Sequence, residues 1–221
     1  MIEKILFLDI ETIPIKYKYN ELDEWGKKLW DNKWKSHKEI SCPESLYDKA
    51  GIYAEFAKII CIGLGYVDNT KQTRLQVLHN DNEYELLNEF NAILYKFYQY
   101  VFTNYNTEYN LCAHNGREFD FPFLCRRMLI NNIPLPDILK SGRRDILLDT
   151  MDMWKFGDYK NYTSLDLLAY VFKIDSPKDG IDGSMIAKVY YEDKNIEKIK
   201  EYCLKDVDTL IKVYKKLNAL P

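Results

Sequence analysis

Short runs of apolar residues recur along the chain and predict strands. They lie at residues 5–10, 58–66, 74–79, 109–114 and 146–148. The turn residues Asp68 and Asn69 separate the second run from the third, so these two runs are expected to form a hairpin. The last run is short, which suits an edge strand. The runs therefore predict a sheet that contains at least one antiparallel pair.

Apolar residues at three- and four-residue steps predict helices between these strands. One helix is expected to follow a capping Asp81 and to run to about Phe102, and another to run from Pro122 through Leu129. Residues 165–172 predict a third. The longest stripe predicts a final amphipathic helix through Ile196, Ile199, Cys203, Val207, Leu210, Tyr214 and Leu217. Strands interspersed with helices indicate the α/β class.

Residues 16–56 are rich in Lys, Trp and Tyr, and they predict a helical insertion that packs on the body of the protein. The apolar positions with helical spacing are Leu22, Trp25 and Leu29, which Trp30 and Trp34 would extend. An exposed aromatic platform for nucleic-acid bases is the alternative role for these side chains. No internal repeat or linker interrupts the sequence, so residues 1–221 are expected to form a single domain.

The net charge and the cysteine content of the chain limit the partners and the metal or disulfide sites that it is expected to have. The net charge of −3 argues against the tight binding along a nucleic-acid backbone that basic proteins show. The objection is weaker for an enzyme that holds only a strand end, since metal ions would neutralise an acidic centre. The five cysteines include no Cys-x-x-Cys pair, so free thiols in a reducing compartment are expected. No signal peptide or apolar run of about 20 residues is visible, which predicts no membrane partner and a cytoplasmic location.

The first group of candidate catalytic residues is Asp9 and Glu11, at the end of the first predicted strand. Residues two apart on a strand share a face, so both carboxylates are expected to project together while Ile10 turns into the core. Hard divalent cations bind oxygen ligands and take one or two carboxylates each. The pair is therefore a candidate metal site, although two solvated charges are the more ordinary explanation when it is taken alone.

The second group surrounds Asp120, which stands between a predicted strand and a predicted helix in the segment HNGREFDFPFL. Its carboxylate would either cap the helix or point toward a metal ion, and the two roles differ in the direction of the side chain. His114 is expected to pack at a strand end rather than to bind metal. Phe119 and Phe121 are expected to pack rather than to stack on bases.

The third group is Tyr202 and Asp206, four residues apart on the final predicted helix. They lie one turn apart on one face and border the apolar stripe, which places them where the helix meets the body. Asp208 and Glu201 are expected to be solvated charges.

Basic pairs and one further turn complete the candidates. The basic pairs are Arg126–Arg127 and Arg143–Arg144. They are candidates for contacts to backbone phosphates, with surface solubility as the alternative. Residues 178–184 predict a turn leading into a helix that Asp182 or Ser184 would cap, and no catalysis is expected there.

In this order, the three groups resemble the motifs of the DEDD superfamily of 3′–5′ exonucleases. FLDIET resembles the first motif, HNGREFDFPFL the second and YCLKD the third. The segment HNGREFDFPFL most resembles the proofreading domain of family B DNA polymerases, and stand-alone exonucleases related to that domain are the most similar of all. One branch has a His five residues before the last Asp, where this chain has Glu201; the DEDDy branch has a Tyr four before it, where this chain has Tyr202. The chain therefore resembles the DEDDy branch.

The resemblance implies a ribonuclease H-like fold, with a central mixed five-stranded sheet flanked by helices. It implies an exonuclease that releases nucleoside 5′-monophosphates with two divalent cations, Mg²⁺ or Mn²⁺. The implied metal ligands are Asp9, Glu11, Asp120 and Asp206. Tyr202 would orient the attacking water, and Thr12 would approach the 3′ end. The expected partner is a single-stranded nucleic-acid 3′ end, with DNA favoured over RNA.

Two rival functions remain for the same sequence. A non-catalytic nucleic-acid-binding module would keep the fold without the chemistry, but four acids converging on one site repel each other without metal. A phosphatase or a nucleotide-hydrolysing enzyme is disfavoured, because the chain contains neither a Gly-x-x-x-x-Gly-Lys-Ser/Thr loop nor a Gly-x-Ser-x-Gly nucleophile.

Overall fold

Five strands form one mixed sheet in the order β3-β2-β1-β4-β5 in the computed structural model, which describes residues 1–36, 42–140, 142–158, 162–175 and 180–220. The strands are β1 (Ile5–Pro14), β2 (Ala57–Val67), β3 (Thr73–His79), β4 (Asn110–Ala113) and β5 (Leu147–Asp149). β2 is antiparallel to β1 and to β3, whereas β4 is parallel to β1 and β5 to β4. The predicted hairpin, the five-stranded mixed sheet and the edge strand are confirmed.

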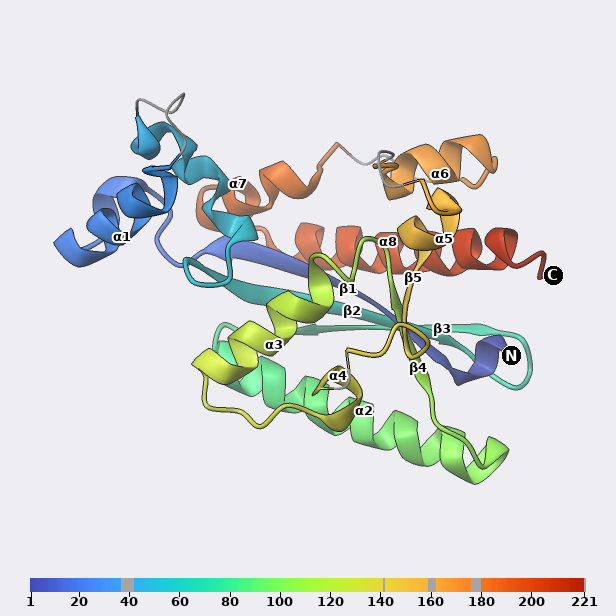
Figure 1. The fold of residues 1–221 in the computed structure, drawn as a ribbon. Helices are drawn as coiled ribbons and strands as arrows, with labels where there is room; N and C mark the ends of the chain where they lie inside the picture. Colours follow the sequence, from blue (N-terminus) through green and yellow to red (C-terminus); the bar gives the residue numbers. More distant parts are fainter. Residues whose placement is uncertain (37–41, 141, 159–161, 176–179, 221) are drawn as a thin grey trace.

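Helices cover both faces of this sheet (Figure 1). On one face lie α2 (Glu83–Tyr105), α3 (Asp120–Ile130) and α4 (Asp137–Lys140). Across the other face lies α8 (Ile196–Leu217), which contacts α5 (Thr150–Lys155), α6 (Leu165–Val171) and α7 (Ile186–Tyr191). No helix among the described residues is both long enough and apolar enough to cross a membrane.

The central strand β1 is buried on both faces. Leu6, Leu8 and Ile10 pack into the core shared with α2 and α3, whereas Ile5 and Phe7 pack against α8. A strand covered on both sides needs apolar residues in every position, which explains why its sequence is a continuous apolar run. Side chains alternate along a strand, so Asp9 and Glu11 project from the same face as Ile5 and Phe7, toward α8.

Two predicted boundaries were wrong. β1 continues past the apolar run that ends at Ile10, because Glu11 to Pro14 still pair with β2, and it ends at Pro14, a residue that is tolerated at a strand end. α2 is capped by the Asn82 side chain rather than by Asp81.

The predicted cap at Asp182 is confirmed. Asp182 accepts a hydrogen bond from the Ser184 amide at 2.8 Å, whereas residues 176–179 of that segment lie outside the described residues.

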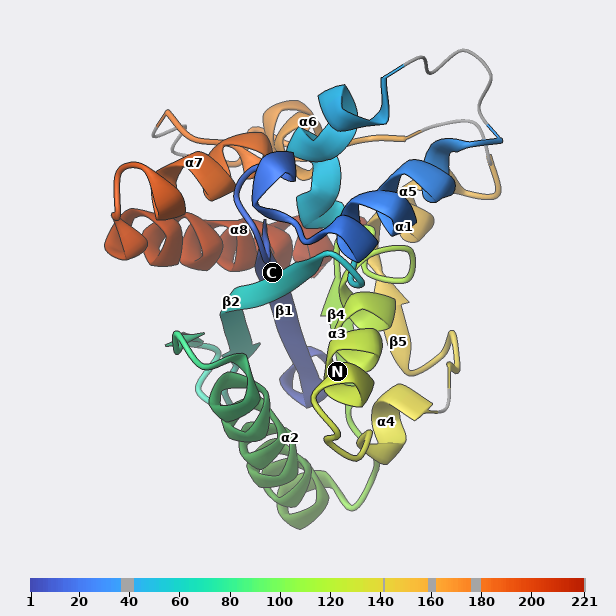
Figure 2. The same ribbon diagram turned by 90° about the vertical axis from the view of Figure 1, so that its left-hand side faces the viewer.

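Residues 16–56 link β1 to β2 and contain the 3-10 helix η2 (Tyr19–Glu21), α1 (Glu24–Trp34) and the 3-10 helix η3 (Pro43–Ile52). Figure 1 and Figure 2 show this insertion at one end of the sheet, away from both chain termini.

The aromatic core of the insertion centres on Trp30, which is fully buried and lies with its ring centroid 5.0 Å from that of Tyr47. Trp34 packs beside it, so core packing is confirmed for these two tryptophans. Trp25 and Leu29 were predicted on the same face, but their exposed fractions are 63% and 45%. The reason is that Trp30 and Trp34 define the face that meets η3, and Trp25 and Leu29 lie to one side of it.

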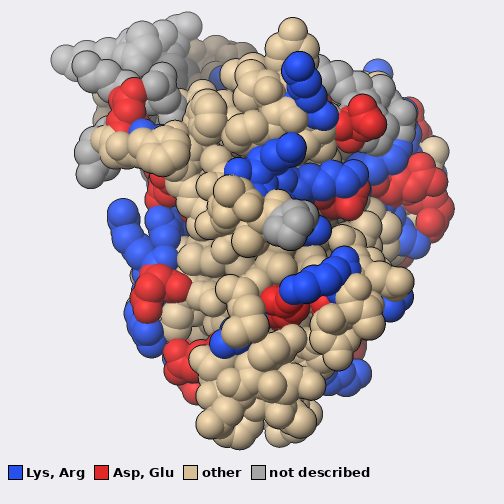
Figure 3. All heavy atoms as spheres, turned by 90° about the vertical axis from the view of Figure 1, so that its right-hand side faces the viewer, with Lys and Arg blue, Asp and Glu red and all other residues tan. Residues whose placement is uncertain are grey.

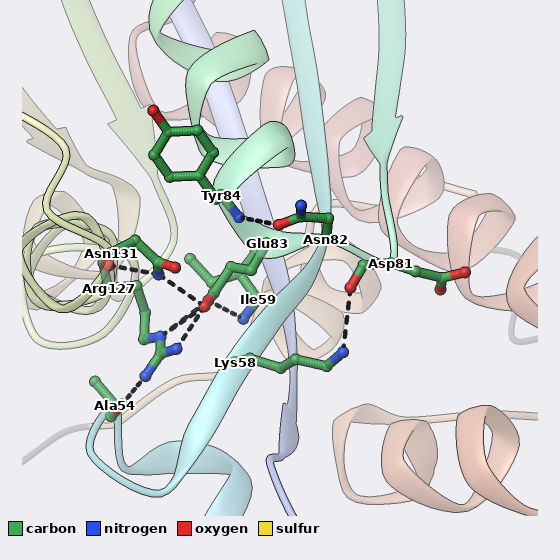
Figure 4. A network of polar contacts seen from close by, with 9 residues as sticks. All are labelled: Ala54, Lys58, Ile59, Asp81, Asn82, Glu83, Tyr84, Arg127 and Asn131. Atoms are coloured by element: carbon green, nitrogen blue, oxygen red, sulfur yellow. Dashed lines mark hydrogen bonds and ion pairs between the residues drawn. The ribbon is translucent and has the colours of Figure 1, made fainter.

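A buried ion pair connects α2 with α3 (Figure 4). Arg127 donates to both carboxylate oxygens of Glu83, and its Nη1 donates to the Ala54 carbonyl at 2.8 Å. Glu83 also accepts from the Ile59 amide at 2.8 Å and from the Asn131 side chain at 2.9 Å. Both roles predicted for Arg127, a phosphate contact and a soluble surface charge, were therefore wrong.

Candidate active site

Asp9 and Glu11 lie on the face of β1 that α8 covers. They pair across the sheet with Gly63 and Cys61 of β2, and Ile10 between them packs into the opposite core as predicted. Because β1 extends to Pro14, the two acids sit within the strand rather than at its end. The pairing register shifts directly after Glu11, an irregularity of the kind that re-aims side chains near functional sites.

α8 approaches β2 closely because β2 has glycines where the helix crosses it. A Cβ atom on Gly63 would lie 2.8 Å from Cys203 Sγ and 2.8 Å from Val207 Cγ2, and one on Gly65 would lie 2.8 Å from Val207 Cγ1. Contacts that short do not occur between real side chains, so any larger residue would displace the helix. The glycines therefore allow α8 to carry its polar residues up to β1.

Asp120 is the first residue of α3, but its carboxylate does not cap that helix. The capping position belongs to Phe119, and no side chain caps it. Instead, Asp120 Oδ1 accepts a hydrogen bond from the Ile10 amide at 3.2 Å. The side chain thus points at β1 between Asp9 and Glu11, and the capping role considered for it was wrong.

The turn before Asp120 is held by Asp149, a buried residue at the end of β5 that was not among the sequence candidates. Its carboxylate accepts hydrogen bonds from the amides of Asn115 and Arg117, each at 3.0 Å. Asn115 has a φ of 58°, and a Cβ on Gly116 would meet a neighbouring side chain at 2.4 Å. Asp149 also caps α5, and an acid before a short helix is the only sequence signal for it; that signal predicts the cap but not the support of a distant loop.

The remaining candidates of this segment have structural roles. His114 contacts the Thr150 hydroxyl and the Thr163 carbonyl, each at 2.9 Å, and burial lowers its pKa. Phe119 and Phe121 pack in the core beside α3, as predicted. His114 is therefore a packing residue and not part of the acidic cluster.

Asp9 and Glu11 feel the charges of the other acids, which places the four carboxylates near one another. Burial, and then the charges of Asp120 and Asp206, raise the pKa of Asp9 well above its ordinary value. Burial, and then Asp9 and Asp206, do the same for Glu11. Burial raises the pKa of Asp120 to about 7 and that of Asp206 to about 6, although hydrogen bonds to backbone amides and to Tyr202 respectively oppose these shifts. Three elements, β1, α3 and α8, therefore supply one acidic centre.

No basic side chain in the described part of the chain forms an ion pair with these acids. Glu11 is only 6% exposed, yet its carboxylate makes no hydrogen bond to any described residue. A buried carboxylate without a partner is costly, whereas divalent cations bind carboxylate oxygens directly. The donor set therefore fits divalent metal ions.

Tyr202 stands beside the acids on α8. Burial, followed by the charges of Asp206, Glu11 and Asp9, raises its pKa further above the ordinary value of 10. The phenol is therefore protonated at neutral pH. Glu201, at the position of the His in the other branch, is exposed.

Other candidates lie outside the cluster. Asp208 pairs with Lys212 at 2.6 Å, and the Thr12 hydroxyl donates to the Gly51 carbonyl at 2.7 Å, which fastens the insertion to β1. Arg143 pairs with Asp145 at 2.6 Å.

Cysteines were expected only to be free thiols, and all five are free. Cys203 was not recognised as a neighbour of the site, but its Sγ lies 3.5 Å from Asp9 Oδ2. Its place in the apolar stripe of α8 gave no signal of this contact.

A family model described as RNase_H superfamily matches residues 49–218, well over half of the chain. The chain belongs to the RNase H superfamily. A family B DNA polymerase from the hyperthermophilic archaeon Pyrobaculum calidifontis matches 97% of the chain, with a TM-score of 0.58 and 16% sequence identity. The chain spans only 24% of that polymerase. A search of the curated proteins found no match.

Membership of the RNase H superfamily confirms the ribonuclease H-like fold expected from the motifs. The likeness to the polymerase, at its low identity, supports the same fold. The acidic cluster of this RNase H superfamily chain lies on the central strand and on the two helices that flank it on opposite faces.

Proposed function

We propose that this protein is a two-metal-ion 3′–5′ exonuclease of the DEDDy type that releases nucleoside 5′-monophosphates from nucleic-acid 3′ ends. The observation that carries the proposal is the convergence of four buried or half-buried carboxylates beside a protonated tyrosine, on the RNase H superfamily fold. The residues are Asp9, Glu11, Asp120, Asp206 and Tyr202. We propose further that residues 1–221 make up one exonuclease domain, with residues 16–56 as an insertion.

Asp9 is the acid best suited to contact both metal ions, because the acids of both neighbouring helices raise its pKa. Glu11 and Asp206 would complete the ligands of one ion, and Asp120 would hold the other, partly through water. When bound, the ions supply a nucleophile from water and neutralise charge on the scissile phosphate and the leaving 3′ oxygen.

Tyr202 would orient the attacking water rather than take its proton. A general base needs a pKa near the operating pH, and the pKa of Tyr202 lies above 10. A protonated hydroxyl held beside Asp206 is instead a fixed donor and acceptor.

The proposed substrate is a single-stranded 3′ end, and DNA rather than RNA, since a solved structure of similar fold is a DNA polymerase. On the face shown in Figure 3, basic and acidic side chains lie interspersed around uncharged surface. The described residues of this face form no continuous basic track, and the net charge of −3 suits an enzyme that holds a strand end through metal ions better than one that grips a long backbone.

The test is the release of labelled mononucleotides from matched single-stranded DNA and RNA, labelled at the 3′ or the 5′ end. With Mg²⁺ or Mn²⁺, a 3′ label should appear as mononucleotide at the first time points, while a 5′-labelled strand should shorten stepwise. Asp9→Ala should abolish both by removing the acid shared between the ions.

Absence of mononucleotide release with either ion would exclude the exonuclease. Equal nucleic-acid binding with and without a chelator, together with no release, would identify a binding module. Hydrolysis of a generic phosphomonoester instead of an oligonucleotide would identify a phosphatase.

A further inference from the structure

A sulfur atom borders the acidic cluster. Cys203 lies on α8 next to Tyr202 and is fully buried. Its Sγ lies 3.5 Å from Asp9 Oδ2, and potential ligand atoms of Asp9, Glu11 and Cys203 all lie within 4.8 Å of one another. The proposed exonuclease chemistry uses the two carboxylates and leaves the thiol without a role.

The spacing of these atoms suits a small tetrahedral ion. A metal ion bound to one sulfur at about 2.3 Å and one oxygen at about 2.1 Å in tetrahedral geometry separates the two ligand atoms by roughly 3.6 Å. The observed separation of Cys203 Sγ and Asp9 Oδ2 is 3.5 Å. The Cys203 thiol donates to Asp9 at this distance, so the two ligand atoms already stand at a separation compatible with such an ion once the thiol proton is lost.

Glu11 supplies an independent indication of a ligand. It is only 6% exposed, has no hydrogen-bond partner among the described residues, and contributes an oxygen to the same group of atoms. Ligand softness then decides which ion is favoured. Mg²⁺ prefers oxygen ligands only, whereas a thiolate favours Zn²⁺ and softer ions of similar geometry.

We propose that Asp9, Glu11 and Cys203 form a mixed carboxylate–thiolate site that binds one thiophilic divalent ion, Zn²⁺ or Cd²⁺. On binding, the Cys203 S–H bond breaks, its proton passes to water, and the sulfur electron pair forms a bond to the ion, with no change of oxidation state. Because the ion occupies Asp9 and Glu11, it excludes the hard cation and inhibits nucleotide release. This inhibition rests on the proposed exonuclease function, whereas the binding does not.

The test is a titration of the full chain with Cd²⁺, followed by the ultraviolet sulfur-to-cadmium charge-transfer absorbance. The exposed thiol Cys42 is first replaced in a Cys42→Ser background, so that it does not contribute to the signal. We expect one equivalent of Cd²⁺ to produce the band. Cys203→Ser should abolish it, and Cys112→Ser, which removes a buried thiol that is not in the cluster, should leave it intact.

A second variant keeps the test decisive if Cys203→Ser does not fold. Asp9→Asn retains the thiol but loses a charged ligand. Removing even an outer-shell partner of a metal site costs about 10–100-fold in affinity, so this variant should raise the Kd for Cd²⁺ by at least about tenfold.

Persistence of the band in folded Cys203→Ser would overturn the assignment. So would its loss in Cys61→Ser alone, since the Cys61 thiol acts on Cys203 from the neighbouring strand. The two proposals fail separately. A cadmium band without nucleotide release under Mg²⁺ or Mn²⁺ would reject the exonuclease function and support the thiolate site. Nucleotide release without the band would support the exonuclease function and reject the thiolate site.

Discussion

Asp120 and Asp206 favour their protonated forms because burial removes water from the carboxylates. Their pKa values are about 7 and about 6, against 3.8 for the free side chain. Near neutral pH, the folded chain without metal therefore binds protons more tightly than the unfolded chain does. A cation bound to these acids would remove that penalty, which links metal binding to stability.

The first prediction concerns Asp206→Asn in the absence of metal. With a folded pKa of about 6 and an unfolded value near 3.8, the contribution of Asp206 to stability is fully present below about pH 4 and is lost as the pH rises through 6. We expect the variant to match the wild type in free energy of unfolding at about pH 4 and to exceed it by about 3 kcal/mol at about pH 8, since each pKa unit corresponds to about 1.4 kcal/mol. Urea unfolding with EDTA measures this difference.

Asp208→Asn is the matched control, because Asp208 lies on the same helix but pairs with Lys212 outside the cluster. The prediction fails if the free energies of unfolding of Asp206→Asn and the wild type differ by the same amount at about pH 4 and at about pH 8. Added Mn²⁺ at about pH 8 should raise the melting temperature of the wild type more than that of Asp206→Asn, since the variant lacks a charged ligand.

The second prediction separates orientation from metal binding. Tyr202→Phe removes one hydroxyl and leaves all four carboxylates, so we expect kcat for nucleotide release to fall roughly 10–100-fold from misplacement of the water. The Kd for Mn²⁺, measured by calorimetry, should stay within about twofold of the wild type. Loss of Mn²⁺ binding in this variant would show that Tyr202 acts on the metal site and not on the water.

At the scale of elements, the distance between α8 and the sheet determines whether the site assembles. Gly63 faces Cys203 and Val207 with no room for a Cβ atom, so the third prediction is that Gly63→Ala displaces α8. Overpacking of this kind costs about 1–3 kcal/mol. Because Tyr202 and Asp206 would move with the helix, nucleotide release should fall by about a hundredfold if the shift approaches about 1 Å.

Gly183→Ala is the control for this substitution, since no atom lies within 4 Å of a Cβ built there. It should leave activity unchanged. Wild-type activity in a folded Gly63→Ala variant would show that the site tolerates a displaced helix.

Local spacing predicted the parts of the site that lie within one element. Asp9 and Glu11 share a strand face, and Tyr202 and Asp206 share a helix face, because the two-residue and four-residue repeats are fixed by backbone geometry. The order of strands and helices likewise followed from apolar periodicity. The sequence alone could not choose the direction of Asp120, because its partner is the Ile10 amide, 110 residues earlier in the chain.

Contacts between elements explain why the predictions for Arg127 and Trp25 were wrong. Arg127 lies in a pair of arginines that suggests a surface, but its partner Glu83 is 44 residues away. Trp25 and Trp30 have similar local surroundings, and only the position of η3 decides which of them is buried. Each of these outcomes depends on where a second segment packs, and spacing along one segment does not contain that information.

At the scale of the whole molecule, the Glu83–Arg127 pair joins four segments around the site: α2, α3, β2 and the end of the insertion at Ala54. Asp120 begins the helix that Arg127 anchors. Both side chains of the pair are buried, at 7% and 5% exposure, so neither charge is solvated if the other is removed. Because of this burial, the double substitution should cost less free energy of unfolding than the sum of the two single substitutions.

The fourth prediction is that Arg127→Met costs about 3–5 kcal/mol in the free energy of unfolding near neutral pH, because it leaves the Glu83 carboxylate buried without its cation. Adding Glu83→Gln should recover a large part of that loss, since the amide is uncharged and its oxygen can still accept from the Ile59 amide. Urea unfolding of the two single variants and the double variant forms a thermodynamic cycle. If the double variant loses the sum of the two single losses, the residues act independently. A smaller loss means that the ion pair holds the four segments as one unit and that its cost lies in an uncompensated charge.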